Sequence, residues 1–577
     1  MFKKILFQIH WFLGITAGLI LSIMGVTGAI YSYDQQILKW VNSDSYVVQA
    51  ENTPKLTPAQ LYQHFNTTQP EIKINSITIA KDPTSSSIVN IEKEGERRGY
   101  NMMVNPYNAE VLPDVKGRKL LLLIQQIHRN LTAGEVGKQI TGACALMLIY
   151  FVLSGLYLRW PKKHSARQWL AVKPKLKGRN FIWDLHAVVG TWVIVFYLLF
   201  ACTGLYWSYD WWRSGMFKVM GVEQPKRQDH GAAPQNQNRG MQQGKQSDRN
   251  NDKKSEPQLD NTQLITALNQ TWSGFNSQVG RDYSTLTLSL PKKDDGKVEL
   301  SFVDATPQHE RARNQAIYNY QTGNIEKMEL YEDKKLNQKI MSSMLPVHRG
   351  SFFGPIYQFV AMLASLAMPL FLVTGWMLYL KRRKQKKLTQ VARQSLAGQY
   401  IDPNAKPWLI TYATQTGVAE QLAWSTATSL QEAHQPVQVK PVQQLTQTDL
   451  EQHQQVLFVI STYGTGDAPD LATSFAKKLL KLNVDLKHIN YAVLALGSKE
   501  YPDTYCSFGH AVDAWLKANG AHALFNTIEV DNANPSDIQN WNQSLAKATK
   551  LDLHAVNLEK YLIVGHYNNV IYSTQIA

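Results

Sequence analysis

The chain has 577 residues, a formal net charge of +15, 44% hydrophobic residues and three cysteines. At roughly 100–200 residues per domain, this length predicts three or four domains and excludes a single small fold. The scattered Cys144, Cys202 and Cys506 exclude a disulfide framework and a four-thiolate metal site. The charge fits either a nucleic-acid binder or the basic loops of a membrane protein.

Four long apolar runs predict four membrane crossings. A helix needs about 20 apolar residues to cross a hydrocarbon core of about 30 Å. The runs are Ile5–Tyr31, Ile140–Leu158, Leu185–Trp207 and Ile356–Leu380, with Tyr and Trp at their ends as at a membrane interface. The first run could instead be a signal peptide, since Lys3 and Lys4 precede it. Its apolar core is long, however, and the third run repeats its pattern.

The basic residues predict the orientation. Arg159–Arg179 holds eight Lys or Arg and no acid, and Lys381–Arg393 holds seven more, again without an acid. With Lys3 and Lys4 these clusters fall on one side of a four-crossing chain, which is the cytoplasmic side. Both termini are then cytoplasmic, and 34–127 and 210–347 lie outside. The three flanks together exceed the net charge, so lipid is the expected partner and nucleic acid is not needed.

The membrane part repeats itself without gaps inside the helices. In each copy a histidine is followed at equal offsets by a Gly, a Thr-Gly pair and an Asp: His10, Gly14, Thr27-Gly28, Asp34 and His186, Gly190, Thr203-Gly204, Asp210. A second set also matches: His128-Arg129, Gly134, Ser154-Gly155 and His348-Arg349, Gly354, Thr374-Gly375. We therefore predict a four-helix bundle made from a duplicated two-helix unit, with an axis along the membrane normal.

The outer segments repeat as well. Each has an amphipathic helix (Ala59–Phe65; Leu264–Trp272) and then short alternating strands that end in a turn at 105–108 or 319–323. We expect one small α+β domain in each half. Residues 223–262 are rich in Gln, Asn, Lys, Asp and Gly and should form a disordered insert.

The four repeated histidines predict cofactor binding. The repeat axis pairs His10 with His186 and His128 with His348, each pair at one membrane depth. Two imidazoles from facing helices suit a haem iron with two axial ligands. The repeated glycines leave room for a flat macrocycle, and Arg129 and Arg349 could pair with its propionates. Interfacial histidines bonded to backbone, or polar contacts between helices, stay open as alternatives. His64, His164, His230 and His309 lie outside the repeat and are expected at the surface.

The spacing of these repeated residues resembles that of the PepSY-associated transmembrane family. His10, His128-Arg129, His186 and His348-Arg349 carry the resemblance, which covers about residues 1–385. It implies two PepSY-like periplasmic domains, two b-type haems and electrons that pass outward. The likeness is to bacterial inner-membrane reductases of iron uptake, so the implied external partner is a ferric chelate or siderophore.

The chain after residue 400 has a different composition and predicts a cytoplasmic α/β domain. Residues 401–577 hold 11 Lys, no Arg and 16 acids. Buried strands (Trp408–Tyr412, Val456–Ser461, Tyr491–Leu496) alternate with helices at about Gly417–Leu430, Leu471–Leu482 and Ser507–Ala518. This alternation is typical of a doubly wound parallel sheet that binds ligands at the carboxyl ends of its strands.

The loops after these strands resemble the FMN-binding domain of flavodoxin-like diflavin reductases. One loop alone could be an ordinary capped helix, but three in order are more specific. The resemblance implies phosphate binding by 414–419 and isoalloxazine contacts from Tyr463 and Tyr501. The residues assigned to FMN are Thr414, Gln415, Thr416, Gly417, Val418, Ala419, Thr462, Tyr463, Gly464, Gly466, Leu496, Gly497 and Tyr501. Ala413 and Thr465-Gly466-Asp467 depart from the common pattern, and Cys506 is expected to pack in the core.

Diflavin reductases continue into an FAD and NAD(P)H module of at least about 200 residues, whereas few residues follow this domain here. We expect a separate NAD(P)H-dependent reductase as the electron donor, unless the sequence is part of a longer protein. The domain's acids would suit a basic partner, although a solvated surface explains them equally well.

These predictions describe a multi-domain membrane oxidoreductase. Electrons would pass from FMN through two bis-His haems to an external acceptor. The alternative is a membrane-bound regulator that senses redox state or binds a ligand without turnover. The predicted parts are crossings at 1–33, 128–160, 185–209 and 348–380, outer domains at 34–127 and 210–347, a basic loop at 161–184, a linker at 381–400, a flavodoxin-like domain at 401–550 and a tail at 551–577.

Overall fold

A computed structural model describes residues 2–96, 99–160, 164–176, 178–225, 259–291, 295–394, 406–463 and 466–553. The chain divides into two compact units. Unit 1 contains Met1–Ile15, Leu153–Val193 and Leu370–Ala577, and unit 2 contains Thr16–Val152 and Ile194–Pro369. Most of the predicted insert 223–262 and of the tail 551–577 falls outside the described residues.

Four helical stretches are long and apolar enough to cross a membrane, as predicted. They are Ile5–Tyr31, Gly134–Arg159, Gly178–Ser208 and Pro355–Lys384. They belong to α1 (Phe2–Tyr31), α6 (Gly134–Arg159), α8 (Gly178–Ser208) and the pair α13 (Pro355–Leu366) and α14 (Met368–Gln394). Large apolar side chains along them are exposed, for example Val195 and Ile356. Such exposure suits contact with lipid rather than water.

Two details of these helices differ from the prediction. The fourth stretch is broken at Ala367, between α13 and α14. The basic stretch assigned to a linker at 381–400 instead continues α14 as far as Gln394. Lys and Arg are good helix formers, so a basic composition alone does not end a helix.

Short helices flank the spans in unit 2 and follow the repeat. Helix α2 (Asp34–Val41) begins at Asp34, and α9 (Asp210–Met220) begins at the matching Asp210. Helices α3 (Ser43–Tyr46), α5 (Arg118–Asn130), α11 (Leu336–Ser342) and α12 (Met344–Arg349), with η1 (Ser351–Phe353), complete these connections.

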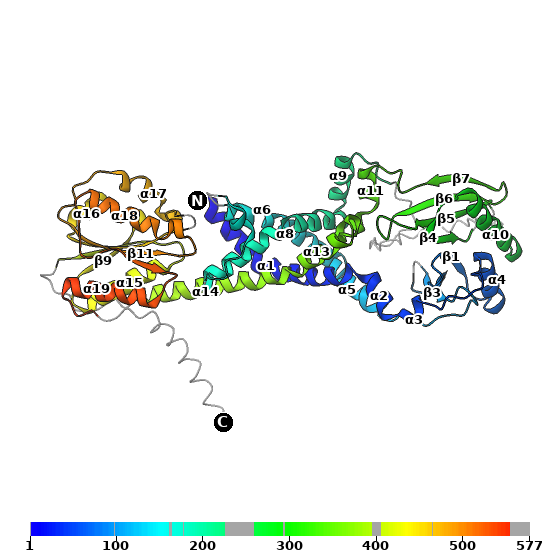
Figure 1. The fold of residues 1–577 in the computed structure, drawn as a ribbon, viewed down its shortest axis with the longest axis horizontal. Coiled ribbons are helices and arrows are strands. Elements are labelled where there is room, and N and C mark those ends of the chain that lie inside the picture. The colour runs from blue at the N-terminus through cyan, green and yellow to red at the C-terminus, as the bar shows by residue number, and fades with distance from the viewer. Residues whose placement is uncertain are drawn as a thin grey trace, which may run out of the picture. The chain divides into compact units, whose positions relative to one another are not determined.

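The two outer segments share one antiparallel sheet rather than forming two separate domains. Its seven strands run in the order β3-β2-β1-β4-β5-β6-β7, and Figure 1 labels all of them except β2. The first segment supplies β1 (Ile74–Ala80), β2 (Ser87–Ile91) and β3 (Tyr100–Val104), and the second supplies β4 (Tyr283–Ser289), β5 (Lys297–Asp304), β6 (Arg313–Asn319) and β7 (Asn324–Glu329). Strands β1 and β4 join them, from Ser76 opposite Ser289 to Ala80 opposite Thr285.

The two predicted amphipathic helices are present and pack with this sheet. Helices α4 (Pro58–Thr68) and α10 (Asn261–Gln278) each begin with a capping box, in which side chain and backbone bond reciprocally. Tyr62 donates a hydrogen bond to Asn261 across the two copies (2.8 Å). Their apolar faces and both halves of the sheet form one core that includes Phe65 and Phe275. Each half alone has only three or four strands, so pairing at β1 and β4 removes two open sheet edges.

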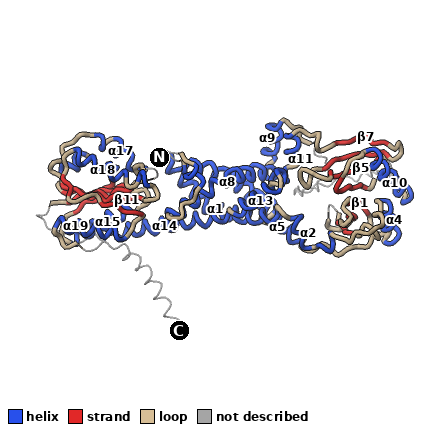
Figure 2. The backbone as a smooth tube through the Cα atoms, in the orientation of Figure 1, coloured by secondary structure: helices blue, strands red, loops and turns tan. Residues whose placement is uncertain are grey.

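The C-terminal part is a doubly wound domain, as predicted. Its parallel sheet has the order β12-β11-β10-β8-β9, with β13 also paired to β11. The strands are β8 (Trp408–Ala413), β9 (Val437–Pro441), β10 (Gln455–Ser461), β11 (Asn490–Gly497), β12 (His522–Ala523) and β13 (Ile528–Asp531). In Figure 2 the strands gather in this sheet and the outer one. The central order agrees with the flavodoxin-like arrangement.

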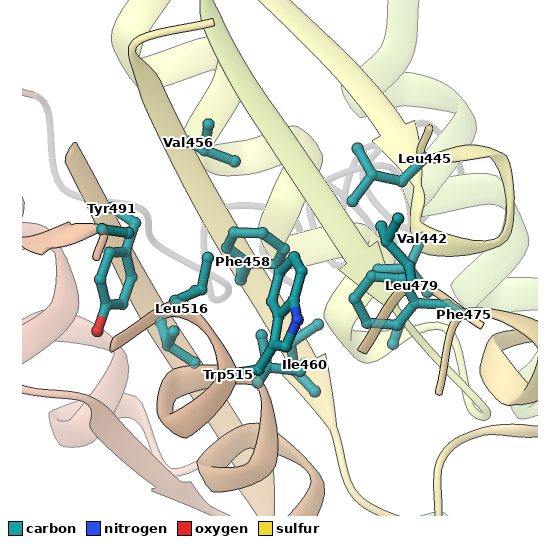
Figure 3. Close-up of a cluster of buried hydrophobic side chains, with 14 of the residues drawn as sticks. Val442, Leu445, Val456, Phe458, Ile460, Phe475, Leu479, Tyr491, Trp515 and Leu516 are labelled. Carbon is teal, nitrogen blue, oxygen red and sulfur yellow. The ribbon is translucent and has the colours of Figure 1, made fainter. Parts of the chain in front are cut away.

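Both faces of this sheet are covered. Val456, Phe458 and Ile460 of β10 pack on one face with Phe475 and Trp515 (Figure 3). Leu457 and Val459 point to the other face, because successive side chains of a strand alternate. The covering helices are α15 (Val418–Glu432), α16 (Gln447–Gln452), α17 (Thr473–Lys477), α18 (Ser507–Ala518) and α19 (Pro535–Thr549). The single helix predicted over Leu471–Leu482 was wrong, since α17 lies between two 3-10 turns.

Candidate functional site

The four repeated histidines lie on two kinds of helix. His10 is on α1 and His186 on α8, within candidate spans, as predicted. His128 is on α5 and His348 on α12, which are separate short helices before the second and fourth spans. Their placement on the crossings themselves was therefore wrong. Residues with positive φ separate each from its span, including Leu131 (51°) and Gly354 (98°).

The repeated glycines consequently have different roles. Gly134 (φ 58°) and Gly354 (φ 98°) make turns that L-amino acids adopt poorly. A Cβ atom added at Gly14 would meet nothing within 4 Å, and one at Gly190 would lie 3.6 Å from Phe371. A Cβ atom at Gly134 or Gly354 would likewise meet nothing within 4 Å, so all four positions are open or nearly so.

The His10/His186 pair is held by hydroxyl groups from neighbouring helices in unit 1. His10 Nδ1 lies 2.7 Å from Ser154 Oγ, and His186 Nδ1 lies 2.7 Å from Thr374 Oγ1. Phe371 packs edge-on against His186, with ring centres 5.1 Å apart. The two imidazoles are close enough to interact electrostatically.

The His128/His348 pair lies in unit 2. The ring centres are 6.1 Å apart, with an angle of 63° between the planes. His128 Nδ1 lies 2.8 Å from the Met24 carbonyl oxygen, and His348 Nδ1 lies 2.7 Å from Thr203 Oγ1. Burial lowers the pKa of His128, and burial with the charges of His128 and Arg349 lowers the pKa of His348 to about 3. Both rings are therefore neutral near pH 7.

The hydrogen bonds determine the tautomer of three of these rings. A carbonyl oxygen only accepts, so His128 carries its proton on Nδ1. The Thr374 hydroxyl donates to the Leu370 carbonyl oxygen, and that of Thr203 donates to Leu199. Each hydroxyl must then accept from its histidine, which also puts the proton on Nδ1. The Nε2 lone pairs of these three rings are directed away from the hydrogen-bond partner, as in a metal ligand.

The repeated Ser/Thr-Gly pairs in the sequence could have predicted these hydroxyl partners of the histidines. Thr27, Ser154, Thr203 and Thr374 all stand in the repeated Ser/Thr-Gly pairs, and Thr27 Oγ1 also lies 3.4 Å from His128 Nδ1. In three of these four Ser/Thr-Gly pairs, the glycine also lies close to the histidine ring that the neighbouring hydroxyl contacts. A Cβ atom at Gly28 would lie 2.8 Å from His128 Cε1, a clash, whereas Gly155 and Gly204 would make ordinary contacts.

Arg349 and Arg129 differ in their burial and in their partners. Arg349 is buried and pairs with Asp34 (3.0 Å) and Glu310 (3.6 Å), with its guanidinium above the Tyr31 ring. Its Nε and Nη2 atoms are buried and make no hydrogen bond to any described residue. Arg129 is exposed. Sequence reasoning missed the partner Asp34, although the repeat had marked that position.

One histidine expected at the surface is buried. His309 is 5% exposed, and its Nε2 lies 2.9 Å from the Tyr331 hydroxyl, which in turn lies 3.3 Å from Ser343 Oγ. Ser343 directly precedes α12, which carries His348. His64 and His164 are exposed as predicted, and His230 lies outside the described residues.

The first predicted FMN loop lies at the carboxyl end of β8. Thr414 Oγ1 accepts a hydrogen bond from the Gly417 backbone N–H (2.8 Å), and α15 then begins without a side-chain cap. Gln415, Thr416 and Val418 are partly exposed in this turn. Uncapped N–H groups and hydroxyls at a helix start suit a phosphate. Ala419 instead packs its side chain in the core, so only its backbone could contribute.

The second and third loops follow β10 and β11. Tyr463 and Asp467 exchange backbone hydrogen bonds (2.8 and 2.9 Å) around a turn that includes Gly466 (φ 102°). Gly464 and Thr465 lie outside the described residues. Thr462 Oγ1 accepts from the Phe508 N–H (3.1 Å), and the Leu496 carbonyl accepts from the Thr462 N–H (2.8 Å).

Close packing explains the remaining residues of this region. A Cβ atom at Gly497 would lie 2.8 Å from the Cys506 nitrogen, so a glycine is needed there. The Leu496 side chain and Cys506 are core residues. Burial raises the pKa of Cys506 to about 12, and its thiol donates to the Ala495 carbonyl (3.2 Å), which suits packing rather than nucleophilic chemistry. Within the described ranges, no three His, Cys, Asp or Glu side chains gather as ligands of a bare metal ion would.

Comparison with known proteins identifies two parts. The family described as PepSY-associated TM region matches residues 7–382, and the flavodoxin family matches residues 410–541. The chain is 34% identical over 157 residues to inducible nitric oxide synthase of Gallus gallus, covering 26% of this chain and 14% of the relative. It is 32% identical over 149 residues to the sulfite reductase [NADPH] flavoprotein alpha-component of Shewanella sp. (strain ANA-3), covering 26% and 24%.

A third relative, NADPH oxidoreductase A of Dictyostelium discoideum, is 30% identical over 148 residues and covers 25% of this chain and 23% of its own length. The chain thus spans a quarter or less of these curated relatives. Among solved structures, a flavodoxin of Streptococcus pneumonia TIGR4 is 25% identical with a TM-score of 0.23, covering 25% of this chain and 98% of its own.

Proposed function

The chain belongs to the PepSY-associated transmembrane family, and from this premise we propose that it carries electrons across a membrane between FMN and two haems. Its flavodoxin domain implies FMN-dependent electron transfer, and the reductase relatives support an oxidoreductase. When bound, FMN and haem accept and release single electrons. The protein's own residues hold these groups, fix their spacing and exclude water.

The spacing of His128 and His348 carries the haem proposal. Two metal–nitrogen bonds of about 2 Å, with roughly 1 Å more from each nitrogen to its ring centre, put the two ring centres about 6 Å apart. The 6.1 Å separation agrees with this. Both rings are neutral and bonded through Nδ1, which leaves Nε2 to bind a metal. His10 and His186 would hold the second b-type haem in the same way.

The arginines support an anionic group beside the second pair. A buried guanidinium with unpartnered Nε and Nη2 atoms is suited to a carboxylate, such as a haem propionate. Arg349 meets this description while Asp34 occupies its Nη1 atom. We assign propionate binding to Arg349 first. Arg129 is exposed and would serve only the outer edge of the group.

The FMN proposal rests on the carboxyl-end loops of the parallel sheet. The uncapped start of α15, with Thr414 and Gly417, would take the phosphate. Tyr463 and Tyr501 would contact the ring system, and Thr462, Gly466 and Gly497 would line it with backbone. Because two of the relatives named above carry NADPH in their names, an NAD(P)H-dependent reductase is the proposed electron donor.

The direction of transfer follows from the proposed topology. The basic flanks support a topology in which both termini and the flavodoxin domain lie in the cytoplasm of a bacterial-type inner membrane, and the seven-stranded sheet lies outside. In this topology the flavodoxin domain would supply electrons to the His10/His186 site, from which they would pass to the His128/His348 site and to an external acceptor. A ferric chelate or siderophore is the proposed acceptor.

The ratio of haem to FMN in purified full-length protein tests this function. Two haems per FMN are expected, with low-spin bands that vanish in the double variant His10→Ala plus His348→Ala. Absence of haem, or bands that persist in the double variant, would contradict the proposal. Reduced FMN should also bleach the oxidised haem bands, and failure to do so would favour a redox-sensing regulator.

A further inference from the structure

A lysine from the membrane part contacts a predicted flavin-binding tyrosine. Lys173 Nζ donates a hydrogen bond to the Tyr501 hydroxyl (3.0 Å) and lies 4.6 Å from the centre of the same ring. The two residues are 328 positions apart in the sequence but lie in the same compact unit. Lys173 belongs to segment 171–176, between the second and third spans, and Tyr501 belongs to the loop after β11.

Asp184 fixes the position of this lysine. Its Oδ2 atom accepts a hydrogen bond from the Lys173 backbone N–H (2.8 Å), and its Oδ1 atom lies 3.7 Å from Lys173 Nζ. The side chains of Lys173 and Asp184 are only 11% and 3% exposed. Asp184 lies in the second turn of α8, so the ammonium group is positioned from a membrane helix rather than from a loose loop.

The rest of the connection is also anchored to the spans. Helix α7 (Ala166–Leu170) ends against them, because Arg159 of α6 donates to the Gln168 carbonyl (2.6 Å) and Trp192 of α8 donates to the Leu170 carbonyl (3.0 Å). Leu176 is buried. A short segment that is held at both ends and by its own lysine can serve as a fixed docking surface.

Two arginines lie near the same loops. Arg159 is close to Tyr501, and Arg179 is close to Tyr463. These are the two aromatic residues expected at the flavin. Three cationic groups therefore lie near the flavin loops, and a phosphorylated flavin that becomes more negative on reduction would be attracted to them.

We propose that Lys173, held by Asp184, is a positioning residue that docks the flavin-binding edge of the C-terminal domain onto segment 171–176. The inference rests on the proposed function and deepens it, because it names the surface at which FMN would face the His10/His186 site. Docking would keep the distance between FMN and the His10/His186 site short, and the rate of electron transfer falls steeply with distance. Loss of the ammonium should weaken docking without removing either cofactor.

Lys175 offers a matched control. It lies two residues away in the same segment, is exposed, and makes no hydrogen bond or ion pair with any described residue. The test compares Lys173→Gln, Lys175→Gln and the conservative Lys173→Arg in the full-length FMN-loaded protein in lipid nanodiscs. Hydrogen–deuterium exchange is followed in peptides that cover 171–176 and 498–505.

Exchange in both peptides should be roughly fivefold faster in Lys173→Gln than in the unsubstituted protein, with Lys175→Gln unchanged and Lys173→Arg intermediate. High salt should weaken this difference, since an ionic contact is screened. Equal exchange in Lys173→Gln and Lys175→Gln would overturn the inference. Loss of bound FMN in Lys173→Gln alone would also overturn it, because Lys173 would then be a cofactor ligand.

Transfer kinetics separate this inference from the proposed function. In Lys173→Gln, bleaching of the haem bands by reduced FMN should be about tenfold slower, while the haem-to-FMN ratio stays unchanged. If the protein held no haem, the exchange experiment would still report docking. If the ratio were two but exchange did not respond, the proposed function would stand and the docking role would fall.

Discussion

The repeat relates the two members of each histidine pair, but the His10/His186 pair and the His128/His348 pair depend on different structures. His10 and His186 are on helices of 30 and 31 residues. His128 and His348 are on helices of 13 and 6 residues that end in left-handed turns. A long helix fixes the direction of a side chain through its own backbone, whereas a helix of six residues is not stable alone.

The second pair therefore needs support from its surroundings. Arg349 next to His348 is paired with Asp34 of α2 and with Glu310. The His309, Tyr331 and Ser343 side chains form a buried chain that reaches the start of α12. Two sites that each combine one histidine from either copy of the repeat can thus differ, one being built mainly by local helix geometry and the other by tertiary contacts.

Removal of one histidine should give the largest effect. His348→Ala and His10→Ala should each lower the haem content from two to about one per FMN, because a haem with one axial ligand missing is held weakly. A pyridine haemochrome assay with FMN quantification measures this. If the second pair depends on its surroundings, His348→Ala should also destabilise the protein more than His10→Ala. Two haems retained in either variant would contradict the ligand assignment.

Loss of the buried ion pair should come next. Arg349→Gln leaves Asp34 buried without its partner and should lower the free energy of unfolding by about 3–5 kcal/mol. Thermal unfolding in detergent measures the change. The exposed Arg129→Gln is the matched control and should stay within about 0.5 kcal/mol. Adding Asp34→Asn should recover part of the loss. Equal effects of Arg349→Gln and Arg129→Gln would remove the contrast between these residues.

The hydroxyl partners should have a smaller effect. Thr203→Val and Thr374→Val remove the acceptor for Nδ1–H without a large change in volume, and should weaken haem affinity about 10–100-fold. Haem titration of the apoprotein measures this, with the matching serine variants as controls. His186 and its partner Thr374 both lie on long helices, whereas His348, the partner of Thr203, lies on the six-residue α12. Thr374→Val should therefore cause the smaller loss of haem affinity. A larger loss at Thr374 would reverse the comparison between the pairs.

The smallest effect should be a pH dependence at His309. Burial lowers the pKa of this imidazole, so the folded state favours the neutral ring. The unfolded chain then binds the proton first, and stability should fall as the pH drops below about 6.5. Protonation also removes Nδ1 as the acceptor for the Arg311 N–H, worth about 1 kcal/mol.

Comparison with His309→Phe isolates this contribution, since the other histidines titrate in both proteins. The difference in unfolding midpoint between the unsubstituted protein and His309→Phe should shrink between pH 7.5 and pH 5.5. A difference that grows as the pH falls would show that the charged ring is preferred and would contradict a buried neutral His309.

Much of the candidate site could be predicted from residues at fixed offsets. The histidine pairs, the glycine-rich loops and the parallel strands of the flavodoxin domain follow from local patterns. The errors at His128, His348 and His309 have a common cause. Hydropathy locates a span but does not show where a helix is interrupted by left-handed residues, nor whether a polar ring in a loop is covered by another segment.

The sequence alone determined the four apolar helices, the duplicated histidine pattern and the doubly wound domain, because length, hydropathy and periodicity are properties of neighbouring residues. Only the tertiary structure joined the outer segments through β1 and β4, gave Arg349 its partner Asp34, and brought Lys173 to Tyr501. Each of these contacts links residues more than 200 positions apart. No local pattern encodes such pairs, since they depend on how the whole chain packs.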